Sequence, residues 1–255
     1  GIAATASEKM TKGFGPLLPG FLNINWSDHE AIKSSISDKT AAILIEPIQG
    51  EGGIRLLPEQ CLKGIREICD EKDILLILDE VQCGVGRTGK LFAHEWAEIE
   101  PDIMMVAKGI GGGFPLGAVL AKENAASGMT AGTHGSTYGG NPLGCSIGLK
   151  VMDIISDPNF LYDVNRKAKL FHDGLLELLR KNTSIFEEVR GKGLMLGLKC
   201  KVKNIDVVNA AYSNKLLTVP AGDNVVRLLP PLTISDKDIN EALNKLDGVM
   251  TALSQ

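Results

Sequence analysis

Short apolar runs alternate with a segment of helical periodicity along the first part of the 255-residue chain. Such runs are typical of strands that are buried on both faces of a sheet. Residues 58–70 lie between the first two runs, carry apolar side chains at helical spacing and begin with a proline, which suits the first turn of a helix. The predicted strands cover residues 41–45, 74–78, 103–106 and 116–120. Strands that alternate with helices predict an α/β fold with a mostly parallel sheet.

The pattern changes after Asn141 and Pro142. Two segments of helical periodicity are followed by three strand candidates, and Ser235 is placed to cap a last helix. The predicted helices cover residues 142–156 and 159–181, and the predicted strands cover 186–190, 194–198 and 224–229. We therefore expect residues 1–145 to form part of a large domain and residues 146–255 to form a small, C-terminal α+β domain.

The composition indicates a soluble globular protein, with 44% hydrophobic and 23% charged residues. The formal net charge is -4 and the basic residues are scattered, so neither nucleic acid nor a membrane surface is an expected partner. No apolar run approaches the roughly 20 residues that a membrane span needs. The five cysteines form no CxxC pair, which predicts free thiols, a reducing compartment and a cytoplasmic location.

The histidines bear on metal binding, and the amino terminus bears on where the sequence begins within its domain. The four histidines lack the spacing of metal ligands, so we expect no metal site. The chain begins with Gly1 rather than methionine, and it has neither the basic lead-in nor the apolar segment of a signal peptide. We therefore expect the sequence to begin partway through a domain.

A carboxylate and a lysine follow two neighbouring predicted strands. Asp79 comes directly after the run 74–78, and Lys108 lies in a glycine-rich loop after the run 103–106. Ligands of α/β sheets bind outside the carboxyl ends of the strands, so both side chains can reach one site. An aspartate that pairs with the ring nitrogen and a lysine that forms a Schiff base are what a protein needs to hold pyridoxal phosphate (PLP). Taken singly, Asp79 could instead be a strand-end cap and Lys108 a solvated loop residue.

The same region has some features of an ATPase. Leu76 to Glu80 has the form of a magnesium-binding strand, and Gly84 to Lys90 fits the beginning of a P-loop. Leu91, however, stands where a P-loop needs a serine or threonine to hold magnesium. Because both motifs would also have to share one strand, we reject this function.

Several longer motifs resemble those of the class III PLP-dependent aminotransferases, which have fold type I. These motifs are Glu46–Gly53, Leu76–Gly89, Pro101–Ile103, Ala107–Gly109, Gly111–Pro115, His134–Leu143 and Arg190–Met195. The resemblance runs from the first residues to the last, so chance matching is implausible. Within the class, the segment Val219–Leu228 makes the chain most similar to the enzymes that act on N-acetylornithine.

The resemblance implies that four residues hold the cofactor. Lys108 would bond covalently to PLP and would then move the proton at the reacting carbon of the substrate. Asp79 would hold the pyridinium nitrogen and so strengthen the electron sink. Gln82 would hydrogen-bond the phenolic oxygen of the cofactor, and Val81 would pack against its ring.

The resemblance also implies a partner subunit and two substrate contacts. Ser136 and Thr137 would bind the phosphate of the neighbouring subunit's PLP, which implies a homodimer with shared active sites; by composition alone they are plain turn residues. Arg227 would capture a substrate carboxylate with its guanidinium fork. Glu51 would pair with Arg227 when the other substrate presents a terminal amine. The alternative for Arg227 is a structural ion pair.

The reaction implied by the resemblance moves the δ-amino group of N-acetylornithine to 2-oxoglutarate in arginine biosynthesis, with N-succinyl-diaminopimelate, in lysine biosynthesis, as a further substrate. Ornithine and 4-aminobutyrate aminotransferases of the same class are the nearest alternatives. Family members also carry a section that precedes the first residue of this chain, with the phosphate-binding loop, a ring-stacking aromatic residue and a substrate-binding arginine. An inactive, PLP-free remnant that only binds or dimerises is therefore the alternative from another class.

Overall fold

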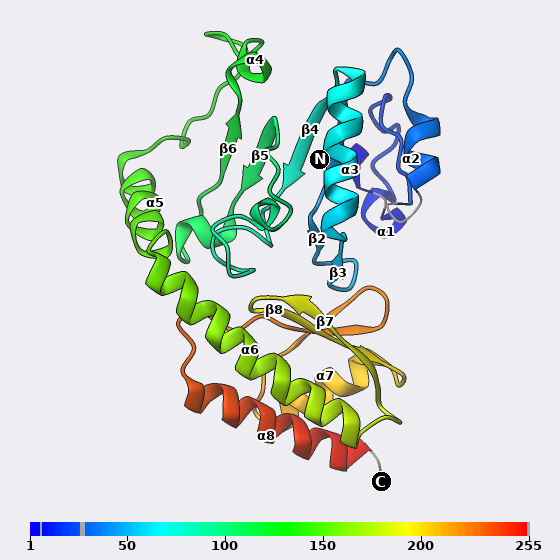
Figure 1. The fold of residues 1–255 in the computed structure, drawn as a ribbon, viewed down its shortest axis with the longest axis vertical. Helices are drawn as coiled ribbons and strands as arrows, with labels where there is room; N and C mark the ends of the chain where they lie inside the picture. The colour runs from blue at the N-terminus through cyan, green and yellow to red at the C-terminus, as the bar shows by residue number, and fades with distance from the viewer. Residues whose placement is uncertain (6, 26–28, 254–255) are drawn as a thin grey trace. The chain divides into compact units, whose positions relative to one another are not determined.

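The computed structural model describes residues 1–5, 7–25 and 29–253, and the chain divides into two compact units, Gly1–Ala41 and Ala42–Gln255. The first unit consists of short helices and turns, as Figure 1 shows. Its helices are η1 (Ile2–Ala4), α1 (Glu8–Thr11) and α2 (His29–Ser35). Helices of this length are too short to show a clear periodicity in the sequence.

The second unit contains a four-stranded sheet with the strand order β1-β4-β5-β6. Its strands are β1 (Ala42–Ile45), β4 (Leu75–Asp79), β5 (Ile103–Val106) and β6 (Ala118–Ala121). The first three strands are parallel, and β6 pairs antiparallel with β5. The predicted α/β fold with a mostly parallel sheet is therefore confirmed.

The chain between β1 and β4 forms a small hairpin and a crossover helix. The hairpin pairs β2 (Ile48–Gln49) with β3 (Arg55–Leu56) in antiparallel fashion. Helix α3 (Glu59–Lys72) follows, and it ends at Asp73 with a φ of +53°, a left-handed conformation that stops the helix. The buried apolar residues of α3 are the ones whose spacing predicts this helix: Leu62, Ile65, Ile68 and Cys69.

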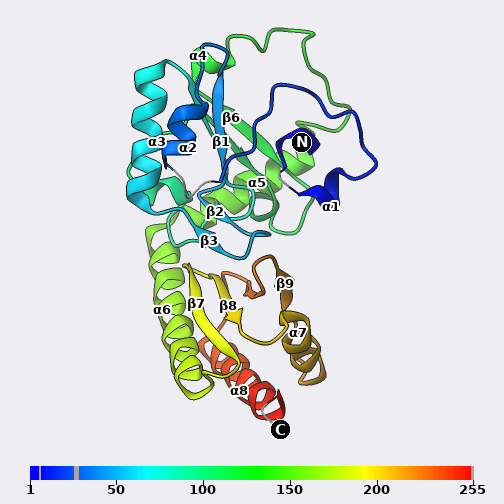
Figure 2. The ribbon, with the colours of Figure 1, turned by 90° about the vertical axis from the view of Figure 1, so that its right-hand side faces the viewer.

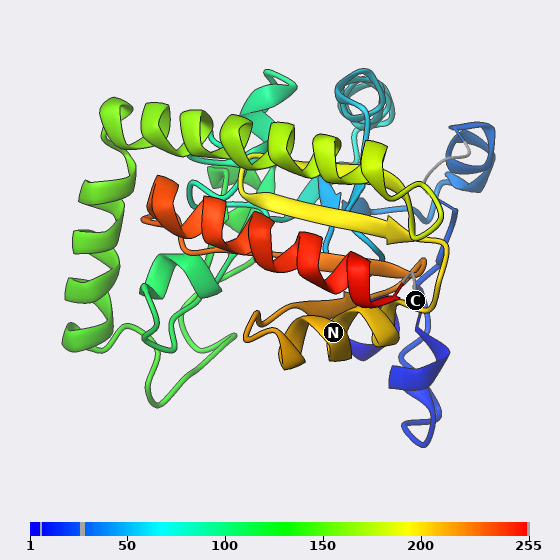
Figure 3. The same ribbon diagram turned by 90° about the horizontal axis from the view of Figure 1, so that it is seen from below.

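A second sheet, antiparallel throughout, has the order β7-β8-β10-β9. Its strands are β7 (Phe186–Lys192), β8 (Met195–Cys200), β9 (Val219–Ala221) and β10 (Val225–Leu228). Its helices are α6 (Pro158–Lys181), α7 (Asn204–Ser213) and α8 (Asp236–Leu253). Figure 3 shows α6 and α8 side by side along β7, whereas α7 contacts β9 and β10 (Figure 2). The expected domain division at residue 145 stays a prediction.

An apolar core holds this second sheet to its helices. Leu175 of α6, Leu198 of β8 and Leu246 of α8 are all 0% exposed and belong to one cluster of buried side chains. Burying a leucine side chain contributes about 1.5–3 kcal/mol, so the helices are held chiefly by this apolar contact.

Two N-terminal caps explain why the sequence predicts two separate helices on either side of residue 157. Helix α5 (Pro142–Ile155) begins after Asn141, whose Oδ1 accepts a hydrogen bond from the N–H of Gly144 at 2.8 Å. Helix α6 begins after Asp157, whose Oδ1 accepts from the N–H of Asn159 at 2.8 Å. Each cap is followed by a proline at the first helical position, where the missing N–H costs nothing. A one-turn helix, α4 (Glu123–Ala126), lies between β6 and α5.

The turn between β7 and β8 packs against the loop that follows β4 in the first sheet. Gly193 in this turn has a φ of +61°, and a Cβ atom there would lie 2.4 Å from the carbonyl carbon of Thr88. The N–H of Leu194 donates to Arg87 O at 3.0 Å, and Arg87 Nη1 donates to Leu194 O at 3.1 Å. The close approach requires a residue without a side chain at position 193.

Within the described ranges, no helix is long and apolar enough to cross a membrane. The described side chains also contain no group of three or more histidine, cysteine, aspartate or glutamate residues that could hold a metal ion.

Candidate active site

The ends of three parallel strands bring polar side chains to one edge of the first sheet. Glu46 follows β1, Asp79 is the last residue of β4, and Lys108 begins the short helix η3 (Lys108–Gly111) after β5. The strand register pairs Ile45 with Leu78 and Asp79 with Met105, so the three strands end at the same level. Asp79 and Lys108 therefore reach the common sheet edge that the sequence predicts for them.

Lys108 has an unusual backbone conformation. Its φ of +48° lies in the left-handed region, which costs a residue with a side chain roughly 1–2 kcal/mol and is concentrated at functional sites. The residue is exposed, and the next residue, Gly109, packs so closely that a Cβ there would lie 3.2 Å from Val85 Cβ. The fold thus holds an accessible lysine in a fixed place at the sheet edge.

Asp79 organises the loop that follows β4. Its Oδ1 accepts a hydrogen bond from the N–H of Val81 at 3.0 Å, which turns the chain away from the sheet. The turn leads to Gln82, whose side chain lies directly over Gly50: a Cβ at position 50 would lie 2.0 Å from Gln82 Oε1. The glycine therefore leaves the space that Gln82 occupies.

Glu51, Gln82 and Arg227 form one hydrogen-bonded cluster. Arg227 Nη1 donates to Glu51 Oε1 at 2.7 Å, and Nη2 donates to Glu51 Oε2 at 3.3 Å. Gln82 accepts from Arg227 Nη1 at 3.3 Å and donates to Glu51 Oε1 at 3.2 Å. These residues come from the β2–β3 loop, the loop after β4 and strand β10, so the cluster joins the two sheets.

The two charges of this cluster differ in burial. The Arg227 side chain is 7% exposed, whereas the Glu51 side chain is 73% exposed. Burial raises the pKa of Glu51, but the hydrogen bonds and charge of Arg227, with smaller contributions from Gln82 and Lys108, outweigh it and hold that pKa below its usual value. Glu51 is therefore ionised at neutral pH and can swing into solvent, while the guanidinium stays in place.

Arg227 also has an unsatisfied donor. Its Nε is buried without a hydrogen-bond partner among the described atoms. Buried donors are rarely left unpaired in a folded protein, and a carboxylate binds a guanidinium through two parallel hydrogen bonds. The geometry therefore suits a second carboxylate that takes the place of Glu51.

Glu46 is a residue of this edge that the sequence analysis missed. Burial raises its pKa, and the negative charges of Asp79 and Glu51 add to this effect, while the Gly50 N–H and the charge of Lys108 oppose it. The Gly50 N–H donates to Glu46 Oε2 at 3.3 Å. The signal that could have found Glu46 is the one that found Asp79, namely a carboxylate at the end of an apolar strand.

Glu80 is a second residue that the sequence analysis missed, and it fixes the loop after β4 by binding backbone N–H groups at the end of that loop. It is 0% exposed and accepts hydrogen bonds from the N–H of Ala93 at 2.6 Å and the N–H of His94 at 2.9 Å, which begin helix η2 (Ala93–Trp96). Its Oε1 also lies 2.7 Å from His94 Nδ1. A buried carboxylate with this many partners rigidifies the segment that carries Val81 and Gln82.

Ser136 and Thr137 lie apart from this cluster in the chain and in their contacts. Both are exposed, in the irregular segment between α4 and α5, and Ser136 Oγ accepts from the N–H of Gly139 at 2.9 Å. Among the described residues, no hydrogen bond joins either of them to Asp79, Lys108 or the Arg227 cluster.

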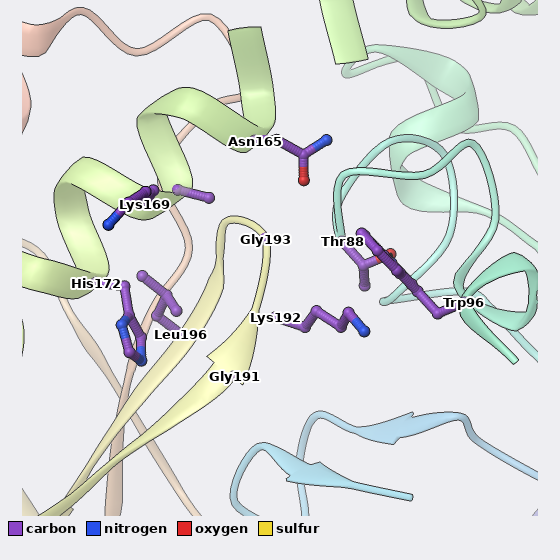
Figure 4. A pocket seen from close by; sticks show the side chains of 10 residues that line it. Thr88, Trp96, Asn165, Lys169, His172, Gly191, Lys192, Gly193 and Leu196 are labelled. Atoms are coloured by element: carbon purple, nitrogen blue, oxygen red, sulfur yellow. Dashed lines mark hydrogen bonds between the residues drawn. The ribbon is translucent and has the colours of Figure 1, made fainter. Parts of the chain in front are cut away.

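A separate hollow lies beside the β7–β8 turn (Figure 4). Lys192 reaches across it to Trp96, with Nζ 3.8 Å from the ring centroid, and the same Nζ pairs with Glu59 at 2.5 Å. Lys169, also in its wall, pairs with Asp173 at 2.6 Å. These cations are already neutralised and no candidate residue lines the hollow, so it is not part of the candidate site.

Comparison with known proteins identifies the family. The chain matches the family model of aminotransferase class-III over residues 1–250. The chain belongs to the class-III aminotransferases, which use pyridoxal phosphate. The acetylornithine aminotransferase of Rhodobacter capsulatus is 64% identical over 252 residues, which are 99% of this chain and 64% of that enzyme.

Solved structures agree with this assignment. The ornithine aminotransferase of Toxoplasma gondii superimposes with a TM-score of 0.94 at 32% identity, over 99% of this chain and 61% of that one. The N-acetylornithine aminotransferase of Stenotrophomonas maltophilia gives a TM-score of 0.83 at 36% identity, over 91% of this chain and 62% of that one. The chain spans less than two thirds of the length of each of these relatives.

Proposed function

We propose that the protein is an acetylornithine aminotransferase, which moves the δ-amino group of N-acetylornithine to 2-oxoglutarate, as in arginine biosynthesis. The observation that carries the proposal is the pair of exposed Glu51 and buried Arg227 close to Lys108. A pocket that binds a dicarboxylate and an amine in turn needs a cation that is free to bind the dicarboxylate and is paired with a carboxylate of the protein when the amine is bound. Similarity to acetylornithine aminotransferases supports the choice of amine. N-Succinyl-diaminopimelate, in lysine biosynthesis, is proposed as a further substrate.

Four residues would hold PLP and work with it. When bound, PLP supplies an electron sink that stabilises negative charge at the substrate carbon bearing the amino group. Asp79, oriented by the Val81 N–H, would accept a hydrogen bond from the protonated ring nitrogen. Lys108 would bond to the cofactor and carry a proton to and from the reacting carbon. Gln82 would hydrogen-bond the phenolic oxygen, and the Val81 side chain would pack against the ring.

Glu51 and Arg227 would select between the two substrates. Arg227 would bind the α-carboxylate of 2-oxoglutarate or glutamate once Glu51 has moved into solvent. Glu51 would cover Arg227 again when N-acetylornithine presents its terminal amine. The unequal burial of the two side chains supports this division of roles. The exposed Glu51 regains water when it moves, and the substrate carboxylate keeps the buried Arg227 paired.

We further propose a homodimer with shared active sites, in the cytoplasm. Ser136 and Thr137 would bind the phosphate of the PLP in the partner subunit. Their exposure, and the absence of hydrogen bonds to the other candidates among the described residues, support a role outside their own subunit's site.

The substrate proposal is tested by side-by-side turnover of N-acetylornithine, ornithine and 4-aminobutyrate, with 2-oxoglutarate as acceptor and glutamate as the measured product. We expect N-acetylornithine to give the highest kcat/KM. A higher value for ornithine or 4-aminobutyrate would assign the protein to one of those activities instead. If the protein turns over none of the three amines, the result would favour the alternative of an inactive, PLP-free remnant.

A further inference from the structure

The turn between β9 and β10 lies directly on the loop that carries Glu51. We call residues 50–54 the Glu51 loop and residues 222–224 the β9–β10 turn. The N–H of Gly222 donates to Glu51 O at 2.8 Å. Gly53 has a φ of +109°, and a Cβ there would lie 2.6 Å from Gly222 O. The two backbones are therefore in contact, with no side chain between them.

Ile54 anchors one end of the Glu51 loop. It is 0% exposed and has a φ of +49°, a conformation that a β-branched residue rarely adopts. Its side chain occupies the space above Gly197 of β8, where a Cβ would lie 2.9 Å from Ile54 Cγ1. Such a strained residue persists only where its surroundings over-determine it, so this end of the loop is fixed.

Asp223 in the β9–β10 turn gathers three cations. Lys199 Nζ donates to its Oδ1, Arg190 Nη1 donates to its Oδ2 at 2.7 Å, and Arg55 Nη2 lies 3.4 Å from the same oxygen. Arg190 Nη1 also donates to Gly53 O at 3.2 Å, within the Glu51 loop. The hydrogen bonds from Lys199 and Arg190 hold the pKa of Asp223 well below its usual value, so the carboxylate is charged at any working pH. Asp223 thus ties β7, β8 and β3 to the β9–β10 turn, and Arg190 links this cluster to the Glu51 loop.

We propose that Asp223 is a positioning residue for the Glu51–Arg227 pair. It fastens the β9–β10 turn to the Glu51 loop and so sets, from outside the pocket, how strongly Glu51 competes with a substrate carboxylate for Arg227. This inference rests on the proposed function, in which Arg227 binds a dicarboxylate.

The direction of the effect follows from what remains fixed when Asp223 is neutralised. Arg227 stays in place because it is buried in β10, between Gly197 of β8 and Val219 of β9. Glu51 is exposed and depends on its loop for its position. Loosening the loop lowers the effective concentration of the Glu51 carboxylate at Arg227, and a competing carboxylate then binds more tightly.

The test is a double-mutant cycle on the PLP-loaded, full-length enzyme. Glutarate serves as the probe because it has two carboxylates but no oxo group to accept an amine. Its Kd is measured by calorimetry for the wild type, Asp223→Asn, Glu51→Gln and the double variant. We expect Asp223→Asn to lower the Kd about threefold to tenfold, within the range of couplings between neighbouring residues, and to have no effect when residue 51 is glutamine. An equal shift in both backgrounds, a higher Kd or no shift would overturn the proposal.

Matched variants separate positioning from folding. Asp173→Asn removes an exposed carboxylate that pairs with Lys169 on α6, and it should leave the Kd unchanged. Asp223→Glu keeps the charge and should restore the wild-type Kd. If Asp223→Asn does not fold, Lys199→Met removes one of the three cations and should shift the Kd in the same direction; an unchanged Kd in that variant would overturn the proposal.

Arg227→Gln distinguishes this inference from the function on which it rests. If that variant binds glutarate as tightly as the wild type, the assignment of Arg227 as the carboxylate-binding residue is wrong. If Arg227→Gln loses binding while Asp223→Asn binds like the wild type, only the role of Asp223 is wrong.

Discussion

At the scale of single residues, the environment of Arg227 decides what the site can do. The guanidinium is buried, one of its donors is unpaired, and its counter-ion Glu51 is exposed. A purely structural ion pair would gain from having both partners fixed and fully satisfied. The unequal pair fits better with a cation that exchanges one carboxylate for another.

Replacing Arg227 by lysine tests this exchange. Lysine keeps the charge but loses the planar fork that holds a carboxylate by two hydrogen bonds. Loss of one charge-assisted hydrogen bond, about 1.5–3 kcal/mol, should raise the KM for 2-oxoglutarate about 10-fold to 100-fold. The check is steady-state kinetics with N-acetylornithine held at saturation. Arg180→Lys on the exposed face of α6 is the control, and a KM for 2-oxoglutarate that stays at the wild-type value in Arg227→Lys would contradict the carboxylate role.

At the scale of elements, turns of the second sheet hold their positions by packing against loops of the first. The β7–β8 turn meets Thr88 at Gly193, and the β9–β10 turn meets the Glu51 loop at Gly222. Both contacts are made by backbone atoms, so they depend on residues that lack a Cβ.

Alanine at position 193 should push the β7–β8 turn away from the loop that carries Thr88. Its Cβ would lie 2.4 Å from the carbonyl carbon of Thr88, which cannot move without shifting backbone. Gly132→Ala is the matched control, because Gly132 has a φ of +88° but nothing within 4 Å of its Cβ position. In urea unfolding we expect Gly193→Ala to lose about 1–3 kcal/mol more than Gly132→Ala, the usual cost of overpacking. Equal losses would mean that the turn is free to move.

Asp102 fastens α3 to the strands of the first sheet, and its contribution depends on pH. Its Oδ2 accepts hydrogen bonds from the N–H of Leu76 and from Arg66 Nη1, both at 2.8 Å. Burial raises the pKa of Asp102, but these hydrogen bonds and the charge of Arg66 outweigh it and hold that pKa below its usual value. The stabilisation is therefore complete above the unfolded pKa of about 3.9 and is lost as the pH falls through the lower folded pKa.

The corresponding variant is Asp102→Asn, with urea unfolding measured from pH 7 down to pH 2.5. We expect the wild type to be more stable by about 1–2 kcal/mol at pH 7 and the difference to shrink below pH 4. Asp173→Asn, which removes an exposed carboxylate, should show little difference at any pH. A wild-type advantage that persists unchanged at pH 2.5 would show that the charge of Asp102 is not its source.

The sequence predicts the parts of the site that follow from local pattern. Asp79 and Lys108 are found because parallel strands end at one sheet edge, and α3 is found from its apolar face. The contacts of Asp223 are not found, because Arg190 and Lys199 lie far from it in the chain and only the pairing of β7, β8 and β10 brings them together. The contact between Glu80 and His94 is missed for the same reason, because a buried carboxylate is recognised only once its partners are known. The helix α7 is missed because its apolar positions are weakly periodic.

At the scale of the whole molecule, the proposed homodimer makes each active site depend on two chains. Lys108 would come from one subunit, and Ser136 and Thr137 would come from the other. This arrangement can be tested with two inactive variants, Lys108→Ala and the double variant Ser136→Asp, Thr137→Asp, whose added carboxylates would repel the phosphate.

Mixing these two variants should restore activity if the sites are shared. In a mixed dimer, both lesions fall in one site and the other site is intact. Random mixing should then give about a quarter of wild-type activity, because half of the dimers are mixed and each has one good site. The mixture is unfolded and refolded together, and glutamate formation is assayed. Each variant refolded alone is the control, and a mixture as inactive as its components would place Ser136 and Thr137 in the same site as Lys108 of their own chain.

The claim that Lys108 makes this protein a PLP-dependent aminotransferase is tested most directly by the visible absorption spectrum of the purified protein with added PLP, before and after N-acetylornithine. We predict a band from PLP bound to Lys108 that is absent in Lys108→Ala, that bleaches on addition of N-acetylornithine, and that persists in the control Lys237→Ala on the exposed face of α8. A spectrum of free PLP only, unchanged by Lys108→Ala and by N-acetylornithine, would contradict the claim.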